Sequence, residues 1–283
     1  MNKVIGFTWI VIILMINGQV YSQSSFSGYV QNESGTPLPY ANIYLAGESC
    51  GTLSDENGFF SFECFVESEK KILLHIDYLG YLSEKIYTDN FTDHQVVQLQ
   101  ESNVELKTIE VVPSSNGQES ILKYKPRKPY YYYQSNVETN YQVASRISNV
   151  DKESGFISEI KFYIGQASVN RLPIRINFYD VDAVCECPGK ALHTTNIIVE
   201  VKKGQNKINL KPYNISIPNS DFYVSFEWLS VSDKRKGKLD FSIGMLPVKS
   251  NYPLLERVGG LAWRELNSSK KSRVLTTIKF IVD

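Results

Sequence analysis

The sequence is poor in the side chains on which most catalytic and metal centres depend. It holds 3 histidines and 4 cysteines in 283 residues. His75, His94 and His193 lie in no H-E-x-x-H motif and at no metal-ligand spacing from a cysteine. The chain also lacks a G-x-S-x-G motif, a P-loop and a paired-carboxylate motif. These absences predict no catalytic residues, no metal site and no cofactor.

Long apolar runs are also scarce, and the one near the start has a specific meaning. Lys3 precedes Val4 to Ile16, a mostly apolar run of 13 residues. Such a run is too short to cross a bilayer but is typical of the centre of a signal peptide. The residues Val20-Tyr21-Ser22 predict cleavage after Ser22, so that residues 1–22 are removed and Gln23 comes first. The alternative is an uncleaved anchor. We expect an exported protein of the periplasm, the outer membrane or the cell surface.

The sequence also lacks apolar side chains repeated at the spacing of an amphipathic helix. No stretch of ten or more residues repeats its apolar side chains at helical spacing, whereas residues 160–164, 174–179, 222–229 and 278–282 alternate apolar and polar side chains. Turn-like glycine, proline and asparagine residues separate these runs, which is typical of an antiparallel sandwich. The sequence therefore predicts a jelly-roll-like sandwich over residues 141–283.

The most informative stretch runs from residue 35 to residue 62. Residues 41–45 alternate apolar and polar side chains, which predicts a strand with one buried face. Residues 51–54 indicate a second short strand, and residues 59–62 indicate a returning one. Between them, residues 55–58 (Asp-Glu-Asn-Gly) predict a hairpin turn, because Asp and Asn bond their own backbone and glycine tolerates a positive φ.

This order of strands and turns resembles the carboxypeptidase-regulatory-like (transthyretin-like) domain. The motif residues that carry the resemblance are Gly35, Pro37, Leu38, Ala41, Asn42, Ile43, Gly51, Thr52, Asp55, Asn57, Gly58 and Phe60. The resemblance covers roughly residues 24–112 and implies a seven-strand Greek-key sandwich over residues 23–112. In such families the domain is a non-catalytic module, often at the start of outer-membrane uptake receptors of Gram-negative bacteria, or on exported carboxypeptidases and surface proteins.

The remainder of the chain is too short for such a receptor. Only 170 residues follow Pro113, whereas a barrel of about 22 strands at roughly ten residues each needs more. Residues 141–283 instead look like the C-terminal β-sandwich that is often joined to this module in bacterial exported proteins of unknown role.

The charge is zero overall but unevenly distributed. Residues 23–112 carry 4 Lys/Arg and 14 Asp/Glu, a net −10, and residues 113–283 carry 25 and 16, a net +9. Two interpretations remain open. The two halves could dock on each other, or the basic half could face an anionic surface such as lipopolysaccharide or a glycan.

Residues 113–140 are predicted to form a basic, tyrosine-rich linker. Lysines and an arginine alternate there with prolines and tyrosines and precede Tyr130 to Tyr133. Basic residues beside aromatic ones can bind glycans by charge and stacking, so Tyr130 and Tyr131 are candidate ligand contacts. Nucleic acid is not expected as a partner of an exported protein. The alternative is a tether whose tyrosines pack on a neighbouring domain.

Export implies an oxidising compartment, in which the cysteines can pair. Cys50 and Cys64 flank the turn at residues 55–58, but a hairpin would place residue 63 opposite residue 50, so a bridge between them is not favoured. Cys185 and Cys187 precede Pro188-Gly189 and are the candidates for a small disulfide ring. As metal ligands they would lack a second pair.

Two tryptophans are candidates for ligand contact. Trp228 shares one strand face with Phe222, Val224 and Phe226, so it is expected in the core. Trp263 follows Gly259-Gly260 in a less regular stretch, beside Arg264. An exposed aromatic side chain there could stack on a sugar ring, which makes Trp263 and Arg264 candidate contacts. The alternative is that Trp263 packs beneath a loop.

The sequence therefore predicts an all-β chain of two sandwiches that binds without catalysing. The expected function is an exported binding or structural module of the cell envelope, whose partner is an envelope protein or a surface glycan. No transmembrane span is expected after signal cleavage. The alternatives are a carbohydrate-binding accessory protein of a polysaccharide-uptake system and, third, a small hydrolase that uses Asp and Glu side chains.

Overall fold

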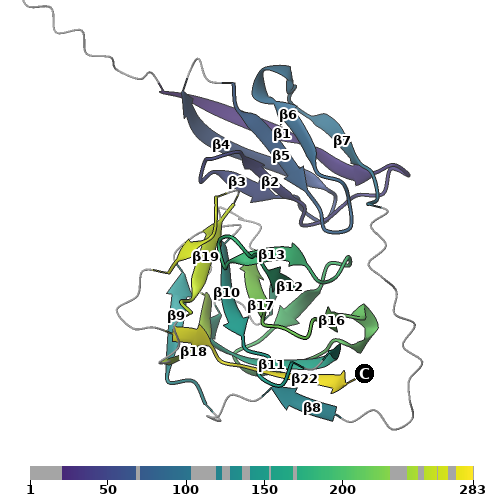
Figure 1. Ribbon diagram of the computed structural model, residues 1–283. Helices are drawn as coiled ribbons and strands as arrows, with labels where there is room; N and C mark the ends of the chain where they lie inside the picture. The colour runs from purple at the N-terminus through teal and green to yellow at the C-terminus, as the bar shows by residue number, and fades with distance from the viewer. Residues whose placement is uncertain are drawn as a thin grey trace, which may run out of the picture.

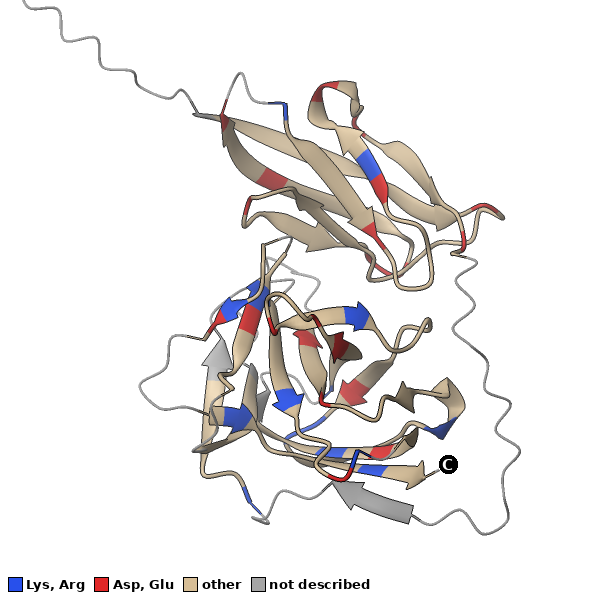
Figure 2. Cartoon of the chain, in the orientation of Figure 1, with Lys and Arg blue, Asp and Glu red and all other residues tan. Residues whose placement is uncertain are grey.

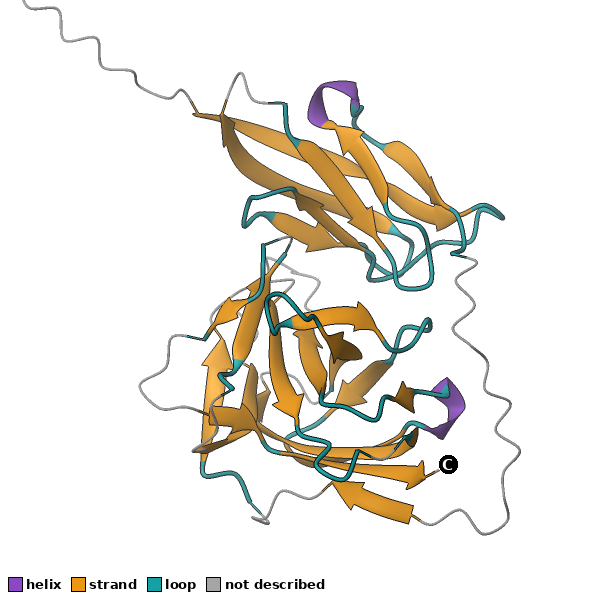
Figure 3. Ribbon diagram, in the orientation of Figure 1, coloured by secondary structure: helices purple, strands orange, loops and turns teal. Residues whose placement is uncertain are grey.

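The computed structural model consists almost wholly of strands, arranged in two sandwiches (Figures 1 and 3). It describes residues 21–67, 71–102, 119–122, 128–135, 141–152, 154–167, 171–229, 241–247, 252–259, 261–266 and 272–282. Within these ranges the helical elements are the short 3-10 turns η1 (Thr88–Asn90) and η2 (Lys211–Tyr213), neither of them long enough to cross a membrane. The all-β prediction is confirmed. The expected signal-peptide core, residues 4–16, lies outside the described residues.

The N-terminal sandwich contains the seven expected strands in two sheets. The three-stranded sheet has the order β4 (Phe59–Glu67), β1 (Tyr21–Asn32), β7 (Gln95–Leu99). The four-stranded sheet has the order β3 (Gly51–Leu53), β2 (Asn42–Leu45), β5 (Leu73–Asp77), β6 (Glu84–Tyr87). Alternate side chains fill the space between the sheets, among them Val30, Ile43, Leu45, Phe60, Leu74 and Ile76. Figure 2 shows more acidic than basic positions on this sandwich, as its composition requires.

The turn at residues 55–58 forms as predicted, but the hairpin does not. Asp55 Oδ1 accepts hydrogen bonds from the backbone N–H groups of Asn57 (2.8 Å) and Phe59 (2.9 Å), and Gly58 has a φ of 75°. The flanking strands, however, belong to different sheets, because β3 pairs with β2 whereas β4 pairs with β1. The turn therefore carries the chain from one sheet of the sandwich to the other.

This change of sheet corrects the prediction for Cys50 and Cys64. The structure joins them by a disulfide with a Cα–Cα distance of 5.9 Å. The argument against this bridge assumed that the two strands are hydrogen-bonded neighbours, which they are not. Cys64 is instead buried in the core between the sheets, at 5% exposure, so the bond ties one sheet to the other.

The C-terminal sandwich packs a seven-stranded sheet against an eight-stranded one, and all of its strand pairs are antiparallel. The seven-stranded sheet comprises β13 (Pro188–Ala191), β12 (Leu172–Val181), β17 (Phe222–Trp228), β10 (Tyr141–Ile147), β19 (Leu255–Val258) and β20 (Arg264–Glu265), with β14 (Ile198–Val201) paired to β12. The eight-stranded sheet comprises β21 (Ser272–Val274), β18 (Phe241–Pro247), β11 (Gly155–Ala167), β22 (Thr276–Val282) and β8 (Glu119–Leu122), with β15 (Gly204–Asn209) and β16 (Ser216–Ile217) on β11 and β9 (Tyr131–Ser135) on β18.

Aromatic side chains from both sheets pack against each other in the core between them. The rings of Phe162 and Phe226, one from each sheet, lie 4.9 Å apart between centroids. Trp228 is 4% exposed in the same core, where the alternation of its strand placed it. The sandwich at residues 141–283 is therefore held by the apolar faces that the sequence indicates.

The predicted linker at residues 113–140 contributes two strands to this sandwich, where the sequence indicated none. β8 pairs with β22, and β9 pairs with β18 from Tyr131 opposite Met245 to Ser135 opposite Phe241. The physical reason lies in the alternation of the tyrosines, because Tyr131 and Tyr133 pack on the core between the sheets. Residues 113–118, 123–127 and 136–140 of the same stretch lie outside the described residues.

Candidate functional site

A buried ion pair marks the place where the two sandwiches meet. β12 and β17 are neighbours, and their register places Arg175 opposite Glu227. Both side chains point away from the core of the C-terminal sandwich, toward the N-terminal one. Arg175 Nη1 lies 3.0 Å from Glu227 Oε2, and the two side chains are 4% and 1% exposed. Such a pair is stable only if further hydrogen bonds satisfy its remaining polar atoms.

The N-terminal sandwich supplies those hydrogen bonds. Arg175 Nη2 donates to the backbone carbonyl of Tyr40. With its nitrogen turned toward Glu227, the Asn42 carboxamide donates to Oε1 at 3.0 Å and accepts from Arg175 Nη1 at 3.1 Å. Asn42 belongs to the motif that carries the family resemblance. The Asn42 amide and the nearby Tyr40 carbonyl therefore hold the N-terminal sandwich against the C-terminal one.

Beside the ion pair, the boundary between the sandwiches opens into a cleft of about 300 Å³, here called the interdomain cleft. Its walls include Tyr44 and Asp77 from the N-terminal sandwich and Gln142, Arg175, Asn196 and Arg257 from the C-terminal one. A second hollow of about 430 Å³ shares the turn at residues 78–81 and Asn196 with it. The two hollows therefore adjoin at Asn196.

Several polar atoms of these walls are buried without a hydrogen-bond partner. They are Gln142 Oε1, Arg175 Nε, Arg257 Nε and both polar atoms of the Asn196 side chain. Buried polar groups in folded proteins are nearly always paired, and each exception costs about 1–3 kcal/mol. The walls of the cleft therefore gather several polar atoms with which water or a ligand can pair.

Tyr44, one of the tyrosines that line the cleft, is held as a neutral hydrogen-bond donor. Tyr44 OH donates to Asp77 Oδ2. Burial raises the pKa of Tyr44, and its hydrogen bond to Asp77 raises it further. The phenol therefore keeps its proton at physiological pH and donates it in the hydrogen bond to Asp77.

Trp263, a candidate from the sequence, lies farther along the same outer face of the seven-stranded sheet. It is half-buried against a small apolar cluster of Ala144, Tyr223 and Leu255. The guanidinium of Arg257 lies 4.6 Å from the centroid of its ring. Trp263 therefore partly packs on the sheet, as the alternative supposed, and keeps part of its surface open beside a residue of the cleft.

Arg264, the other candidate of this stretch, forms an ion pair with the buried side chain of Glu256. Arg264 Nε lies 3.0 Å from Glu256 Oε1, and the other oxygen of Glu256 accepts a hydrogen bond of 2.5 Å from Tyr141 OH. The hydroxyls of Tyr141 and Tyr133 are 2.6 Å apart. Burial, and next the hydrogen bond to Glu256, raise the pKa of Tyr141. The Arg264 side chain itself remains 63% exposed.

Tyr130 and Tyr131 lie on the other sheet and are not brought together with Trp263. Tyr130, which directly precedes β9, is 72% exposed. Tyr131 packs on the core, and its hydroxyl bonds to Ser272. The candidate contacts from the sequence thus fall into two groups, one on each sheet of the C-terminal sandwich.

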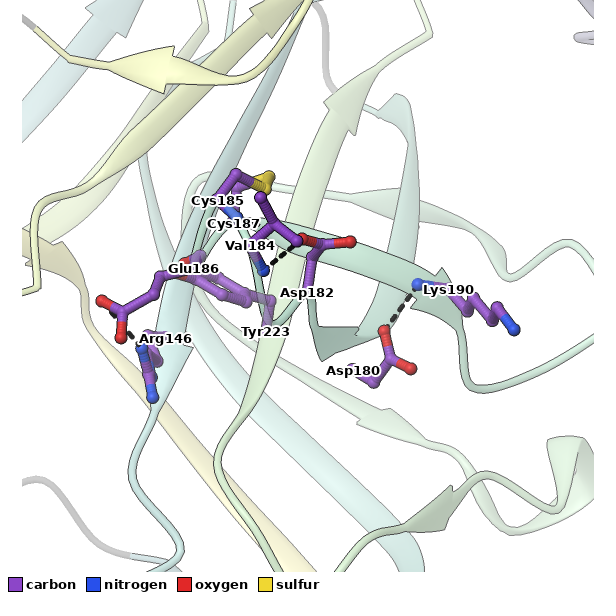
Figure 4. The surroundings of a disulfide bond; sticks show 9 residues. All are labelled: Arg146, Asp180, Asp182, Val184, Cys185, Glu186, Cys187, Lys190 and Tyr223. Carbon is purple, nitrogen blue, oxygen red and sulfur yellow. Dashed lines mark hydrogen bonds and ion pairs between the residues drawn. A yellow bond between two sulfur atoms is a disulfide. The ribbon is translucent and has the colours of Figure 1, made fainter.

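Cys185 and Cys187 are joined by a disulfide in a tight loop over the seven-stranded sheet (Figure 4). Asp182 Oδ1 accepts from the backbone N–H groups of Val184 and Cys185, and Glu186 takes a left-handed φ of 52°. In the part of the chain that the structure describes, no three His, Cys, Asp or Glu side chains are grouped to hold a metal ion.

His193 is a buried, neutral histidine close to Asn196 in the chain. It is 3% exposed; its Nε2 accepts from the Phe178 N–H at 3.2 Å, and its Nδ1 bonds to the Thr195 carbonyl at 2.9 Å. Burial lowers the pKa of His193 to about 4, and the nearby Arg175 charge acts in the same direction.

We therefore expect the free energy of unfolding to fall by about 2 kcal/mol on account of His193 between pH 7 and pH 5. The unfolded histidine takes up a proton near its usual pKa of 6.5, whereas the folded one resists protonation down to about 4. The contribution is thus complete above pH 6.5 and is lost as the pH falls toward 4. Urea unfolding at pH 5, 6 and 7 measures it. His193→Gln should flatten the slope, and exposed His94→Asn should not; equal slopes in all three proteins would contradict the prediction.

The sequence reading missed the residues of the cleft. The alternation of residues 174–179 and 222–229 puts Arg175 and Glu227 at polar positions of two strands, but nothing local shows that these strands are neighbours. Opposite charges at the outward positions of two central strands could have suggested the pair. Asn196 and Gln142 carry no such pattern, and they line the cleft only because the two sandwiches dock.

Comparison with known proteins confirms the family resemblance of the N-terminal part. Residues 26–112 match the family model of the CarboxypepD_reg-like domain. No curated protein matches the chain. Among solved structures, a clostridial cysteine protease, Cwp84, after propeptide cleavage is 11% identical, with 92% of this chain and 65% of that chain covered and a TM-score of 0.40. A structure of the infectious bursal disease virus Gx strain is 13% identical, with 94% of this chain and 65% of that chain covered and a TM-score of 0.26. The chain thus spans about 65% of the length of these two structures, and similarities this low carry no argument.

Proposed function

We propose, starting from the CarboxypepD_reg-like domain at residues 26–112, that this chain is an exported, non-catalytic binding module of the cell envelope. Its two sandwiches act as one body, and its partner is an envelope protein or a glycan. The predicted signal peptide at residues 1–22 supports the location, and the module's usual role in its families supports the absence of catalysis.

The observation that carries this proposal is the interdomain cleft. A binding module needs a concave surface with polar groups that have no partner of their own, and the cleft supplies both. Its two acidic side chains, Glu227 and Asp77, are already engaged within the chain, by Arg175 and by Tyr44.

A carbohydrate-binding accessory protein of a polysaccharide-uptake system is the second candidate function. The position of Trp263 favours it, because an aromatic ring that keeps part of its surface open beside Arg257 can stack on a sugar. Trp263→Ala should then weaken the binding of a glycan without unfolding the sandwich.

The experiment is a pull-down with the mature chain, residues 23–283, from the envelope of its own cell, in parallel with a glycan array. We expect one envelope protein or one class of glycan to be retained reproducibly. Hydrolysis of a peptide or glycan by the purified chain, abolished by Asp77→Asn or Glu227→Gln in a folded variant, would overturn the non-catalytic proposal.

A further inference from the structure

The charges of the interdomain cleft cancel. Arg175 and Arg257 bring two positive charges to its walls, and Asp77 and Glu227 bring two negative ones. A site for a phosphate, a carboxylate or an amine would carry an excess of the opposite charge. The cleft is therefore matched to a ligand without net charge, and the adjoining hollow adds a single acidic side chain, Glu101.

The unpaired atoms around the cleft are both donors and acceptors. Arg175 Nε, Arg257 Nε and Asn196 Nδ2 can donate, whereas Gln142 Oε1 and Asn196 Oδ1 can accept. A hydroxyl group donates one hydrogen bond and accepts two, so a ligand rich in hydroxyls can pair with both kinds of atom. Gln142 and Arg175 are both buried, so their unpaired atoms are built into the fold and are not surface features.

Aromatic side chains and the shape of the cleft add to this match. Tyr44 and Tyr179 line the cleft from opposite sandwiches, and Tyr78 and Tyr81 belong to the turn that it shares with the adjoining hollow. Aromatic rings present apolar faces on which the C–H faces of a sugar can pack. A volume of about 300 Å³ is at the lower end for small-molecule sites, and the second hollow of about 430 Å³ extends it past Asn196.

We propose that the interdomain cleft binds a neutral saccharide, which extends past Asn196 into the adjoining hollow. This inference rests on the proposed function as a binding module and names the ligand class of that module. The hydroxyls of the sugar pair with Gln142, Asn196 and Arg257, which line the cleft, after small rotations of these side chains that expose their buried polar atoms. The site needs both sandwiches, and neither forms it alone.

Saturation-transfer NMR and calorimetry on residues 23–283 test this proposal with glucose, galactose, mannose, N-acetylglucosamine and their disaccharides. Glucuronate and glucosamine serve as charged counterparts. We expect a neutral sugar to bind and its disaccharide to bind more tightly. Asn196→Leu should weaken binding about tenfold, and Gln142→Leu about fivefold. Neither variant should lose stability, because each removes a buried polar atom that has no partner.

Asn206→Leu is the matched control. Its buried amide donates to the Lys202 and Gly204 carbonyls away from the cleft, so this variant should lose stability and keep its affinity. The proposal is overturned if no sugar of the panel binds, if the charged sugars bind better, or if Asn196→Leu binds as the wild type does. An envelope partner retained in the pull-down would then still support the binding module. Loss of sugar binding in Trp263→Ala alone would place the site on the outer sheet face instead.

Discussion

Replacing Arg175 with alanine is expected to destabilise the protein by about 3–5 kcal/mol, the usual cost of breaking a buried ion pair. The change leaves the Glu227 carboxylate 1% exposed, with the Asn42 amide and the 3.5 Å contact to Asn177 as its remaining partners. It also removes the hydrogen bond to the Tyr40 carbonyl that helps to dock the sandwiches. Chemical unfolding of residues 23–283, with wild type and variant compared at one pH, measures the loss.

Arg171→Ala is the matched control for this experiment. Arg171 and Glu200 also lie 3.0 Å apart, but their side chains are 77% and 61% exposed. Exposed pairs contribute only about 0–1 kcal/mol. A loss of similar size in the two variants would show that burial of Arg175 is not what makes its pair important.

A third variant separates the ion pair from the docking of the sandwiches. Arg175→Lys keeps the positive charge but has no fork of N–H groups that can reach Glu227 and the Tyr40 carbonyl together. We expect an intermediate loss of stability and a weaker association of the two sandwiches. Small-angle scattering would show the latter as a larger radius of gyration.

The fold could be predicted from the sequence where the determinants are local. The alternation at residues 41–45, 160–164, 174–179 and 222–229 requires only that one strand face be buried, and these strands are found. The turn at residues 55–58 also depends on local hydrogen bonds of Asp55 and the positive φ of Gly58. The prediction of which strands pair with each other failed, because strands that are close in the chain need not be neighbours in a sheet.

The candidate site could not be predicted for the same reason. Arg175 and Glu227 are separated by about fifty residues, and only the register of β12 and β17 places them together. Asn42 was recognised as part of a motif, but its hydrogen bonds to this pair depend on the docking of two sandwiches. Tyr131 and Tyr133 appeared to belong to a tether, because their strand partner β18 lies more than a hundred residues farther along.

Removing the Cys50–Cys64 disulfide by the double change to alanine is expected to cost about 3 kcal/mol. The bond closes a loop of sequence separation 14, and loop-closure entropy for about 15 residues amounts to about 3 kcal/mol. The Cys185–Cys187 bond, of sequence separation 2, closes a much smaller loop and should contribute much less. Chemical unfolding of both double variants tests the difference. A reducing agent should lower the free energy of unfolding of the wild type by nearly as much as the double change at Cys50 and Cys64 does. The entropic argument would be wrong if the two double variants lost the same stability. Since the bond joins β4 to the residue that directly precedes β3, its loss should loosen the two sheets against each other and leave the C-terminal sandwich intact.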